Sequence, residues 1–427
     1  MKCLSQRPAI RTGKWALGIV RRDAVLRIMS IAVLVCLAVG GRTALGQEQD
    51  RYEQTLDVID AVYSPKLKAV VYIDHKGSVG SINVGDAAAV ARQMTRLPDE
   101  DFTALLRMPG DQMLIGSARG KLYRFDGSEL DELVELSEYQ DPILALSVLG
   151  DTYWASGARG LLAKSTNVKD WEPVEVGQVR QPPIPLPAGE TGTLYFGVAN
   201  IIANTVKIVG SVKGKPAVAD RDYTFFPDEG MIEITNPFDE VSAPSIAFDF
   251  RPGPPFQGGD VSWNVILQDD GRITIAGEFG LIFQSDDGGK SWVRRNGRIS
   301  KTEAAQSYWI SGFIDGSKIA LGGAAGLVGT SDDRGENWVQ LPRPGREGVF
   351  GVRLHDGGKL YVSGAVGLAG TFEAGQWNLV DRSATNLFSW MKSFVELEDG
   401  GLLLLGGNST ALAYQDGEWE RLKLTIE

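Results

Sequence analysis

The chain has 427 residues, of which 52 are glycine, and this length allows one large repeat fold or two to three ordinary domains. Hydrophobic residues make up 43% of the chain, enough for a sizeable core, and the abundant glycine indicates many tight turns between short strands. The net charge is −11, and it becomes −18 without the first 46 residues, which hold eight basic residues and one acidic residue; a surface this acidic repels phosphate groups, so we expect no nucleic acid partner.

Residues 1–46 have the three parts of a secretory signal peptide. A basic region is followed by an uncharged apolar run at 28–40 and then by small residues that end at Gly46. The apolar run is shorter than the ~20 residues that span a bilayer. We therefore expect cleavage near Gly46, a mature chain that begins at Gln47, and export to the periplasm or the cell exterior. An uncleaved N-terminal membrane anchor is the alternative.

Residues 47–177 contain short apolar runs that lead into glycine turns. One run leads into the turn at 116–120, and another leads into the turn at 157–160. Such runs predict strands of an antiparallel sheet, and the turns connect them. Arg119 and Arg159 occupy the same place in these two turns, so we expect both arginines on one face of the repeat fold. The only stretch that approaches a helical pattern is 129–140.

Residues 178–258 interrupt the repeat and predict a small inserted β-rich module. The segment begins with a proline-rich stretch at 182–187 and ends with another at 252–255, which favours stiff, extended connections to a separate module. The predicted strands inside it are 193–198, 206–209, 223–226, 231–234 and 245–250. Two further, degenerate repeats of the main fold are the alternative.

Residues 259–427 resume the repeat. The predicted strands of its clearest copy are 263–267, 273–276, 281–284 and a fourth that opens at Trp292. The turn glycines Gly120 and Gly160 are 40 residues apart, and Gly326 and Gly367 are 41 apart. About seven repeats of ~40 residues match the four-stranded blades of a propeller. We therefore predict an all-β fold, an approximately seven-bladed β-propeller built from 47–177 and 259–427.

Two segments carry a family resemblance. Residues 285–292 match the Asp box, Ser-x-Asp-x-Gly-x-Thr/Ser-Trp, and 331–338 match it with Asn337 in the penultimate place. The sequence therefore resembles Asp-box (bacterial neuraminidase repeat) propellers, and its glycine turns are most similar to those of photosystem II assembly/stability factor-like propellers. The carboxylate is expected to accept hydrogen bonds within its own hairpin, the glycine to take a positive φ, and the tryptophan to pack between sheets. These structural residues are Ser285, Asp287, Gly289, Trp292, Ser331, Asp333, Gly335 and Trp338.

The sequence predicts no catalytic residue, no metal site and no cofactor. Both cysteines, Cys3 and Cys36, lie in the signal, and the two histidines, His75 and His355, are far apart in the chain. A calcium loop at the paired aspartates of each box is the alternative, but the distal glutamate of such a loop is missing. The Arg-Ile-Pro motif expected in a sialidase is also absent.

The resemblance implies partner contact on a propeller face, where Arg119 and Arg159 would meet carboxylates of a partner. Phe225 and Phe226 in the inserted module lie near predicted turns and are further candidates for partner contact. We expect a non-enzymatic scaffold or assembly accessory that binds a membrane or envelope protein complex, such as a transporter, and that is peripheral to the membrane. A secreted, sialidase-like protein that binds or hydrolyses glycosides is the alternative.

Overall fold

The computed structural model describes residues 55–427 except 86–87, 253–260, 298–300, 302–307 and 416. The predicted signal, residues 1–46, lies outside the described residues. Strands dominate the described part, and the helical segments there are short 3₁₀ turns: η2 (Ala158–Gly160), η3 (Ala203–Thr205), η4 (Glu240–Ser242), η5 (Ala324–Gly326) and η6 (Ala365–Gly367). No helix in these described ranges is long and apolar enough to cross a membrane.

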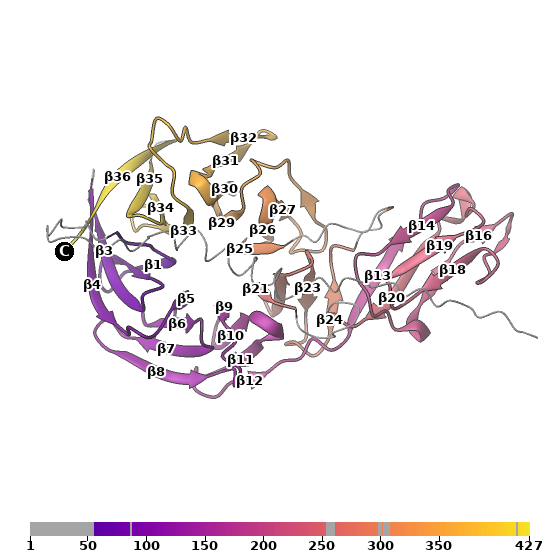
Figure 1. Cartoon of the computed structure of the whole chain (residues 1–427), viewed down its shortest axis with the longest axis horizontal. Helices are drawn as coiled ribbons and strands as arrows, with labels where there is room; N and C mark the ends of the chain where they lie inside the picture. Colours follow the sequence, from indigo (N-terminus) through magenta and orange to yellow (C-terminus); the bar gives the residue numbers. More distant parts are fainter. Residues whose placement is uncertain (1–54, 86–87, 253–260, 298–300, 302–307, 416) are drawn as a thin grey trace, which may run out of the picture. The chain divides into compact units, whose positions relative to one another are not determined.

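The described strands include seven four-stranded antiparallel units, numbered here as blades 1 to 7 in chain order (Figure 1). Blades 1 to 3 contain β1 (Asp60–Ser64), β2 (Ala69–Ile73), β3 (Ser78–Val84), β4 (Ala88–Arg96); β5 (Phe102–Arg107), β6 (Met113–Ser117), β7 (Lys121–Phe125), β8 (Leu130–Glu135); and β9 (Ile143–Leu149), β10 (Thr152–Gly157), β11 (Leu162–Ser165), β12 (Glu172–Pro173). Blades 4 and 5 contain β21 (Trp263–Asp269), β22 (Arg272–Gly277), β23 (Ile282–Ser285), β24 (Trp292–Arg294); and β25 (Trp309–Asp315), β26 (Lys318–Gly323), β27 (Val328–Ser331), β28 (Val339–Gln340). Blades 6 and 7 contain β29 (Val349–His355), β30 (Lys359–Gly364), β31 (Ala369–Glu373), β32 (Gln376–Leu379); and β33 (Met391–Glu396), β34 (Leu402–Gly406), β35 (Thr410–Gln415), β36 (Glu418–Ile426).

The blades stand side by side in a ring. The first strand of each blade contacts the first strand of the next, from β1 and β5 around to β33, which contacts β1 again. The second strands β2, β6 and β34 are buried from end to end, because a neighbouring blade covers each of their two faces. The outer strand β8 is mostly accessible and carries acidic side chains. The segment 129–140, the nearest to a helical pattern in the sequence, thus contains an outer strand.

The ring closes between blades 7 and 1 through their outermost strands. β36 pairs with β4 in parallel, from Lys423 opposite Ala88 to Ile426 opposite Ala91, so the two blades form one eight-stranded sheet. In Figure 1 the yellow strand β36 runs to the indigo strands of blade 1. This pairing joins residues that are more than 300 positions apart in the chain.

The described part of the inserted module, residues 178–252, forms strands beside blade 4. The module contains β13 (Val179–Pro185), β14 (Gly192–Tyr195), β15 (Lys207–Val209), β16 (Ser211–Val212), β17 (Lys215–Pro216), β18 (Tyr223–Phe226), β19 (Met231–Ile234) and β20 (Ser245–Phe250). β15, β20 and β13 continue the sheet of blade 4, and β14, β19 and β18 form a second sheet. The two sheets have three strands each and do not repeat the four-stranded meander of a blade. The predicted all-β propeller with a small inserted β module is therefore confirmed.

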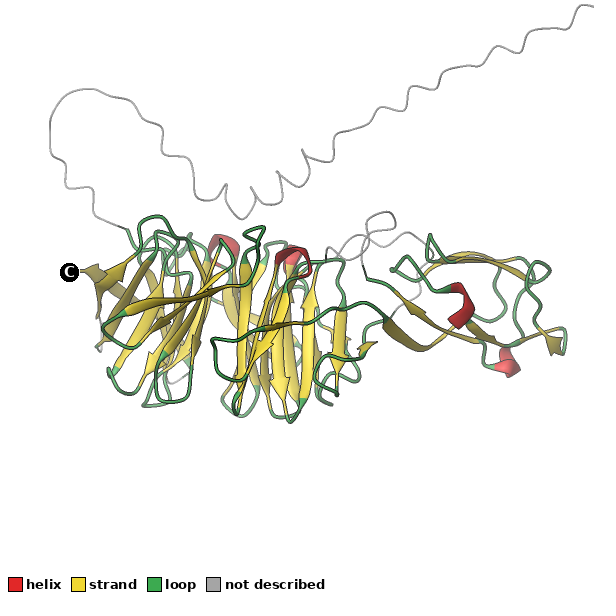
Figure 2. Ribbon diagram, turned by 90° about the horizontal axis from the view of Figure 1, so that it is seen from below, coloured by secondary structure: helices red, strands yellow, loops and turns green. Residues whose placement is uncertain are grey.

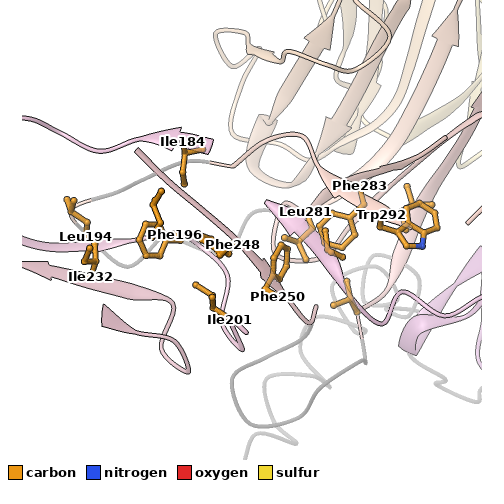
Figure 3. Close-up of a cluster of buried hydrophobic side chains, with 14 of the residues drawn as sticks. Ile184, Leu194, Phe196, Ile201, Ile232, Phe248, Phe250, Leu281, Phe283 and Trp292 are labelled. Carbon is orange, nitrogen blue, oxygen red and sulfur yellow. The ribbon is translucent and has the colours of Figure 1, made fainter. Parts of the chain in front are cut away.

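The module and blade 4 share one hydrophobic core. Ile232 and Phe248 of the module belong to the same buried cluster as Phe283 and Trp292 of blade 4, and the side chains follow one another without a break (Figure 3). Phe250 bridges the two parts, because its ring packs edge-on against Phe248 and against Phe283. The inserted module is thus packed onto the propeller rather than connected to it by its chain ends alone.

The proline-rich stretch at 182–187 is a strand for most of its length, and the expectation of a stiff connection there is wrong. β13 lies between β20 and β24, pairing antiparallel with the first and parallel with the second. The register of β13 shifts between Gln181 and Ile184, so Pro182 and Pro183 fall in a bulge. A bulge needs no hydrogen bond from the residues it contains, which lets two prolines sit inside a central strand. Most of the second proline-rich stretch lies outside the described residues.

Candidate partner-binding face and Asp-box turns

The antiparallel strands of each blade place their connections at two opposite ends. The hairpins between first and second strands and between third and fourth strands share one end, which we call the box end because it contains 285–292 and 331–338. The turns between second and third strands and the links between blades share the other end, which we call the turn end. The short helical turns of the blades lie together at one end of the strands in Figure 2, and η2, η5 and η6 are such second-to-third turns.

The carboxylate of Asp287 organises the hairpin between β23 and β24. It accepts hydrogen bonds from the hydroxyl of Ser291 at 2.6 Å, the backbone N–H of Ser291 at 2.9 Å and that of Lys290 at 3.0 Å. The hydroxyl of Ser285 donates to it at 2.8 Å and in turn accepts from the N–H of Gly289 at 2.8 Å. These bonds, led by that from the Ser291 hydroxyl, lower the pKa of Asp287 from 3.8 to about 2.

The hairpin of blade 5 repeats this arrangement. Asp333 accepts from the backbone N–H of Asn337 at 2.9 Å and from its side-chain amide at 2.7 Å, and the hydroxyl of Ser331 accepts from the N–H of Gly335 at 2.8 Å. These bonds, led by that from the Asn337 backbone, lower the pKa of Asp333. The amide of Asn337 thus replaces the hydroxyl that the motif prescribes.

The glycine of each box allows close packing on the preceding blade. Gly289 has a φ of +87°, and a Cβ there would lie 2.9 Å from the ring of Trp154. Gly335 has a φ of +82°, and a Cβ there would lie 2.2 Å from the amide nitrogen of Gln284. A larger residue would therefore be strained in its backbone and would push the two blades apart.

A third, altered box lies in blade 3. The side-chain oxygen of Asn167 accepts from the N–H of Lys169 at 3.0 Å and from the N–H of Asp170 at 2.8 Å, as the aspartates do in the other two boxes. The indole N–H of Trp171 donates to Val168 at 3.0 Å. The sequence analysis did not assign a role to Asn167. An asparagine two residues after Ser165 is the signal that would have identified it.

Arg119 and Arg159 both lie in second-to-third turns, so both are at the turn end. Arg159 takes a positive φ of 52° inside η2, and its side chain is 60% exposed. Its guanidinium lies 5.6 Å from the centre of the Tyr139 ring and 3.4 Å from a carboxylate oxygen of Asp141. Tyr139 itself is 75% exposed. Arg119 is exposed in the corresponding turn of blade 2.

Phe225 and Phe226 lie side by side on β18, and both are half-buried. The ring of Phe225 packs against Phe196 in the core of the module, with 6.1 Å between the ring centres. Phe238, another aromatic residue of the module, is fully buried. The aromatic side chains of the module therefore serve mainly its core.

Two apolar side chains at the turn end were not singled out in the sequence. Phe388 in the link between blades 6 and 7 is 62% exposed, and Val366 in η6 is 54% exposed. Val366 has a φ of 53°, a conformation that is rare for a β-branched residue. It occupies the place in its turn that Arg159 has in blade 3, and this shared position is the signal that would have identified it. Such strain persists where the surroundings impose it, and it is often found at functional surfaces.

Among the described residues, no group of three or more His, Cys, Asp or Glu side chains is arranged to hold a metal ion. Of the aspartate pairs weighed above as a calcium loop, Asp287 and Asp333 are held by hydrogen bonds from their own hairpins, and Asp286 pairs with Arg272.

Comparison with known proteins defines the class of this chain. No family model matches it, and no curated protein matches it by sequence. A solved structure described as YCF48 bound to D1 peptide has a TM-score of 0.51 at 11% identity, over 84% of this chain and 93% of that one. At this identity the likeness shows the fold alone, and the chain is a β-propeller protein.

Two further solved structures are similar. The WD40 β-propeller domain of Doa1 has a TM-score of 0.49 at 9% identity, over 84% of this chain and 93% of that one. YCF48 from Cyanidioschyzon merolae has a TM-score of 0.43 at 12% identity, over 76% of this chain and 86% of that one.

Proposed function

We propose that this chain is an exported, non-enzymatic β-propeller that acts as a scaffold or assembly accessory by binding a membrane or envelope protein complex. The observation that carries the proposal is the exposed Arg159–Tyr139 pair at the turn end. Export and a position peripheral to the membrane rest on the predicted signal in residues 1–46.

The pair has the properties of a protein-binding anchor. Tyrosine and arginine are enriched among the residues that contribute most to binding at protein interfaces. The ring of Tyr139 holds the guanidinium of Arg159 by a cation–π contact, so less side-chain entropy is lost when a partner binds. Asp141 is the only described carboxylate paired with Arg159. The remaining N–H groups of the guanidinium are suited to a carboxylate of the partner.

Other features support a partner on this end. Phe388 and Val366 add exposed apolar surface to the turn end. The similar fold of YCF48 is described with a bound D1 peptide, which supports a peptide segment as the element of the partner that is contacted. Phe226, half-buried on β18, is the residue through which the inserted module would add to the contact.

A pull-down from detergent-solubilised envelopes tests the proposal. Purified tagged protein is compared with a Tyr139→Ser, Arg159→Glu variant, and captured proteins are measured by quantitative mass spectrometry. We expect the variant to lose ~10-fold or more of the specifically captured membrane protein, as loss of a central anchor does. Lys169→Glu is the matched control, because Lys169 is exposed at the box end of the same blade.

Equal capture by the protein and the variant would rule out the Arg159–Tyr139 pair as the anchor. The proposal also assigns no chemical step to the chain. Release of sugar from a sialic-acid glycoside by the purified protein would contradict that part.

A further inference from the structure

A cavity of about 150 Å³ opens between blades 5 and 6 at the box end. Its walls include Leu341 of blade 5 and Leu354, Leu360 and Phe372 of blade 6, and its rim includes Lys318 and Asp332 of blade 5. The four apolar side chains belong to the hydrophobic cluster between the two blades. An apolar cavity of this size can hold a benzene ring.

The cavity exists because the hairpin between the third and fourth strands of blade 6 is short. In blades 4 and 5 this hairpin is an Asp box, whose glycine lies on a side chain of the preceding blade, as Gly335 lies on Gln284. In blade 6 only Ala374 and Gly375 join β31 to β32, and a Cβ at Gly375 would meet nothing within 4 Å. Thr330 has the place in blade 5 that Gln284 has in blade 4, and no Asp box covers it. The space that a box would fill is therefore open.

The corresponding space between blades 6 and 7 is filled by aromatic rings. Tyr361 of blade 6 packs edge-on against Tyr414 and Trp419 of blade 7. Blade 5 has Ala320 at the position of Tyr361, since each is the third residue of the second strand. The small side chains of blade 5 thus leave room for a ligand beside blade 6.

The rim of the cavity carries two charges that are not paired with each other. In blade 6 the corresponding residues, Lys359 and Glu373, form an ion pair at 3.5 Å. Neither Lys318 nor Asp332 forms an ion pair within the described part of the chain. The ammonium of Lys318 lies against the first hairpin of blade 6, because a Cβ at Gly358 would be 2.5 Å from its nitrogen. One available cation and one available anion therefore stand beside an apolar cavity.

These charges limit the kind of ligand. Asp332 would repel a simple anion, and Lys318 would repel a simple cation. The apolar surface continues at the edge of the cavity, because Val339 pairs with Thr330, shares its face of the sheet and is 61% exposed. A fitting ligand carries both charges close together beside one apolar group of the size of a phenyl or leucyl side chain.

We propose that this cavity binds a free α-amino acid with an apolar side chain. The side chain lies against Leu354, Leu360 and Phe372, while Lys318 holds the α-carboxylate and Asp332 holds the α-ammonium by charge-assisted hydrogen bonds. The site is at the box end, whereas the Arg159–Tyr139 pair is at the turn end, so either can fail without the other.

Isothermal titration of the whole exported chain tests the proposal with five probes: phenylalanine, leucine, glycine, 3-phenylpropanoate and phenethylamine. We expect phenylalanine or leucine to bind. Glycine should bind at least ~10-fold more weakly, because it has no side chain to bury. The last two probes keep the phenyl ring but lack the ammonium and the carboxylate respectively, so each should also bind at least ~10-fold more weakly than phenylalanine.

Variants test the residues. Lys318→Gln and Asp332→Asn should each weaken binding ~10-fold or more, and Thr330→Gln should abolish it by giving blade 5 the longer side chain of blade 4. Lys169→Gln is the matched control, because Lys169 is exposed in the altered box of blade 3, away from the cavity. Circular dichroism checks that each variant is folded.

The proposal is overturned if neither phenylalanine nor leucine binds, or if glycine or either analogue binds as tightly as they do. It is also overturned if Lys318→Gln binds with the affinity of the Lys169→Gln control.

Discussion

The carboxylate of Asp287 is exposed, yet it accepts four hydrogen bonds from its own hairpin. Every donor lies within four residues of Asp287, and that is why the sequence pattern alone was enough to anticipate these bonds. The indole N–H of Trp292 has no hydrogen-bond partner in the described part of the chain, and this was not predictable in the same way. Its surroundings come from the inserted module, which no local pattern places next to β24.

Replacing Asp287 by alanine removes the acceptor for two backbone N–H groups. We expect the free energy of unfolding to fall by ~1–2 kcal/mol, at the low end for lost hydrogen bonds because the site is exposed. Urea denaturation measures the change. Asp332→Ala is the control, since Asp332 is exposed and its side chain forms no hydrogen bond within the described part of the chain, and it should change stability by less than ~0.5 kcal/mol.

We also expect the stability lost in Asp287→Ala to depend on pH. The pKa of Asp287 is about 2 in the folded chain and 3.8 ordinarily, so its ionised form stabilises the fold above pH 3.8. This contribution is lost as the pH falls toward 2. The stability gap between the protein and Asp287→Ala should therefore be full at pH 6 and should shrink below pH ~4. A gap that does not change with pH would show that the carboxylate charge is not involved.

At the scale of elements, the sequence predicts strands that follow a local pattern, but it does not predict which distant strands pair. The strands β18, β19 and β20 begin and end at the residues that the sequence predicts, because their apolar residues form short runs bounded by turns. The two parallel pairings, β13 with β24 and β4 with β36, were not predicted. Parallel partners are distant in sequence, and nothing in either strand alone specifies the other.

The closure of the ring can be tested by truncation. Removing residues 423–427 deletes the part of β36 that pairs with β4, together with the buried side chain of Leu424. We expect a loss of ~3 kcal/mol or more in the free energy of unfolding, from several backbone hydrogen bonds and one buried leucine. Removing only Glu427, whose exposed carboxylate pairs with Arg92, should cost less than ~1 kcal/mol. Equal stability of the two truncations would contradict closure by β36.

For the whole molecule, the shared core makes the module and the propeller one cooperative unit. Trp292 and Phe283 of blade 4 belong to the same buried cluster as Ile232 of the module. We expect one calorimetric unfolding transition for both parts. Ile232→Ala should lower the temperature of that single transition, because it removes buried volume. Two transitions, of which Ile232→Ala moves only one, would show that the module unfolds independently.

The pairing of blade 7 with blade 1 also limits when the fold can be completed. Ala89 is bonded by Thr425, which lies 336 positions later in the chain, so this edge of β4 has no partner until residues 423–426 have been synthesised. During that interval β4 is an open strand edge, which is a template for pairing with other chains. Such long-range pairing also slows folding. We therefore expect the exposed edge of β4 to be the site most open to pairing with other chains before residues 423–426 join it.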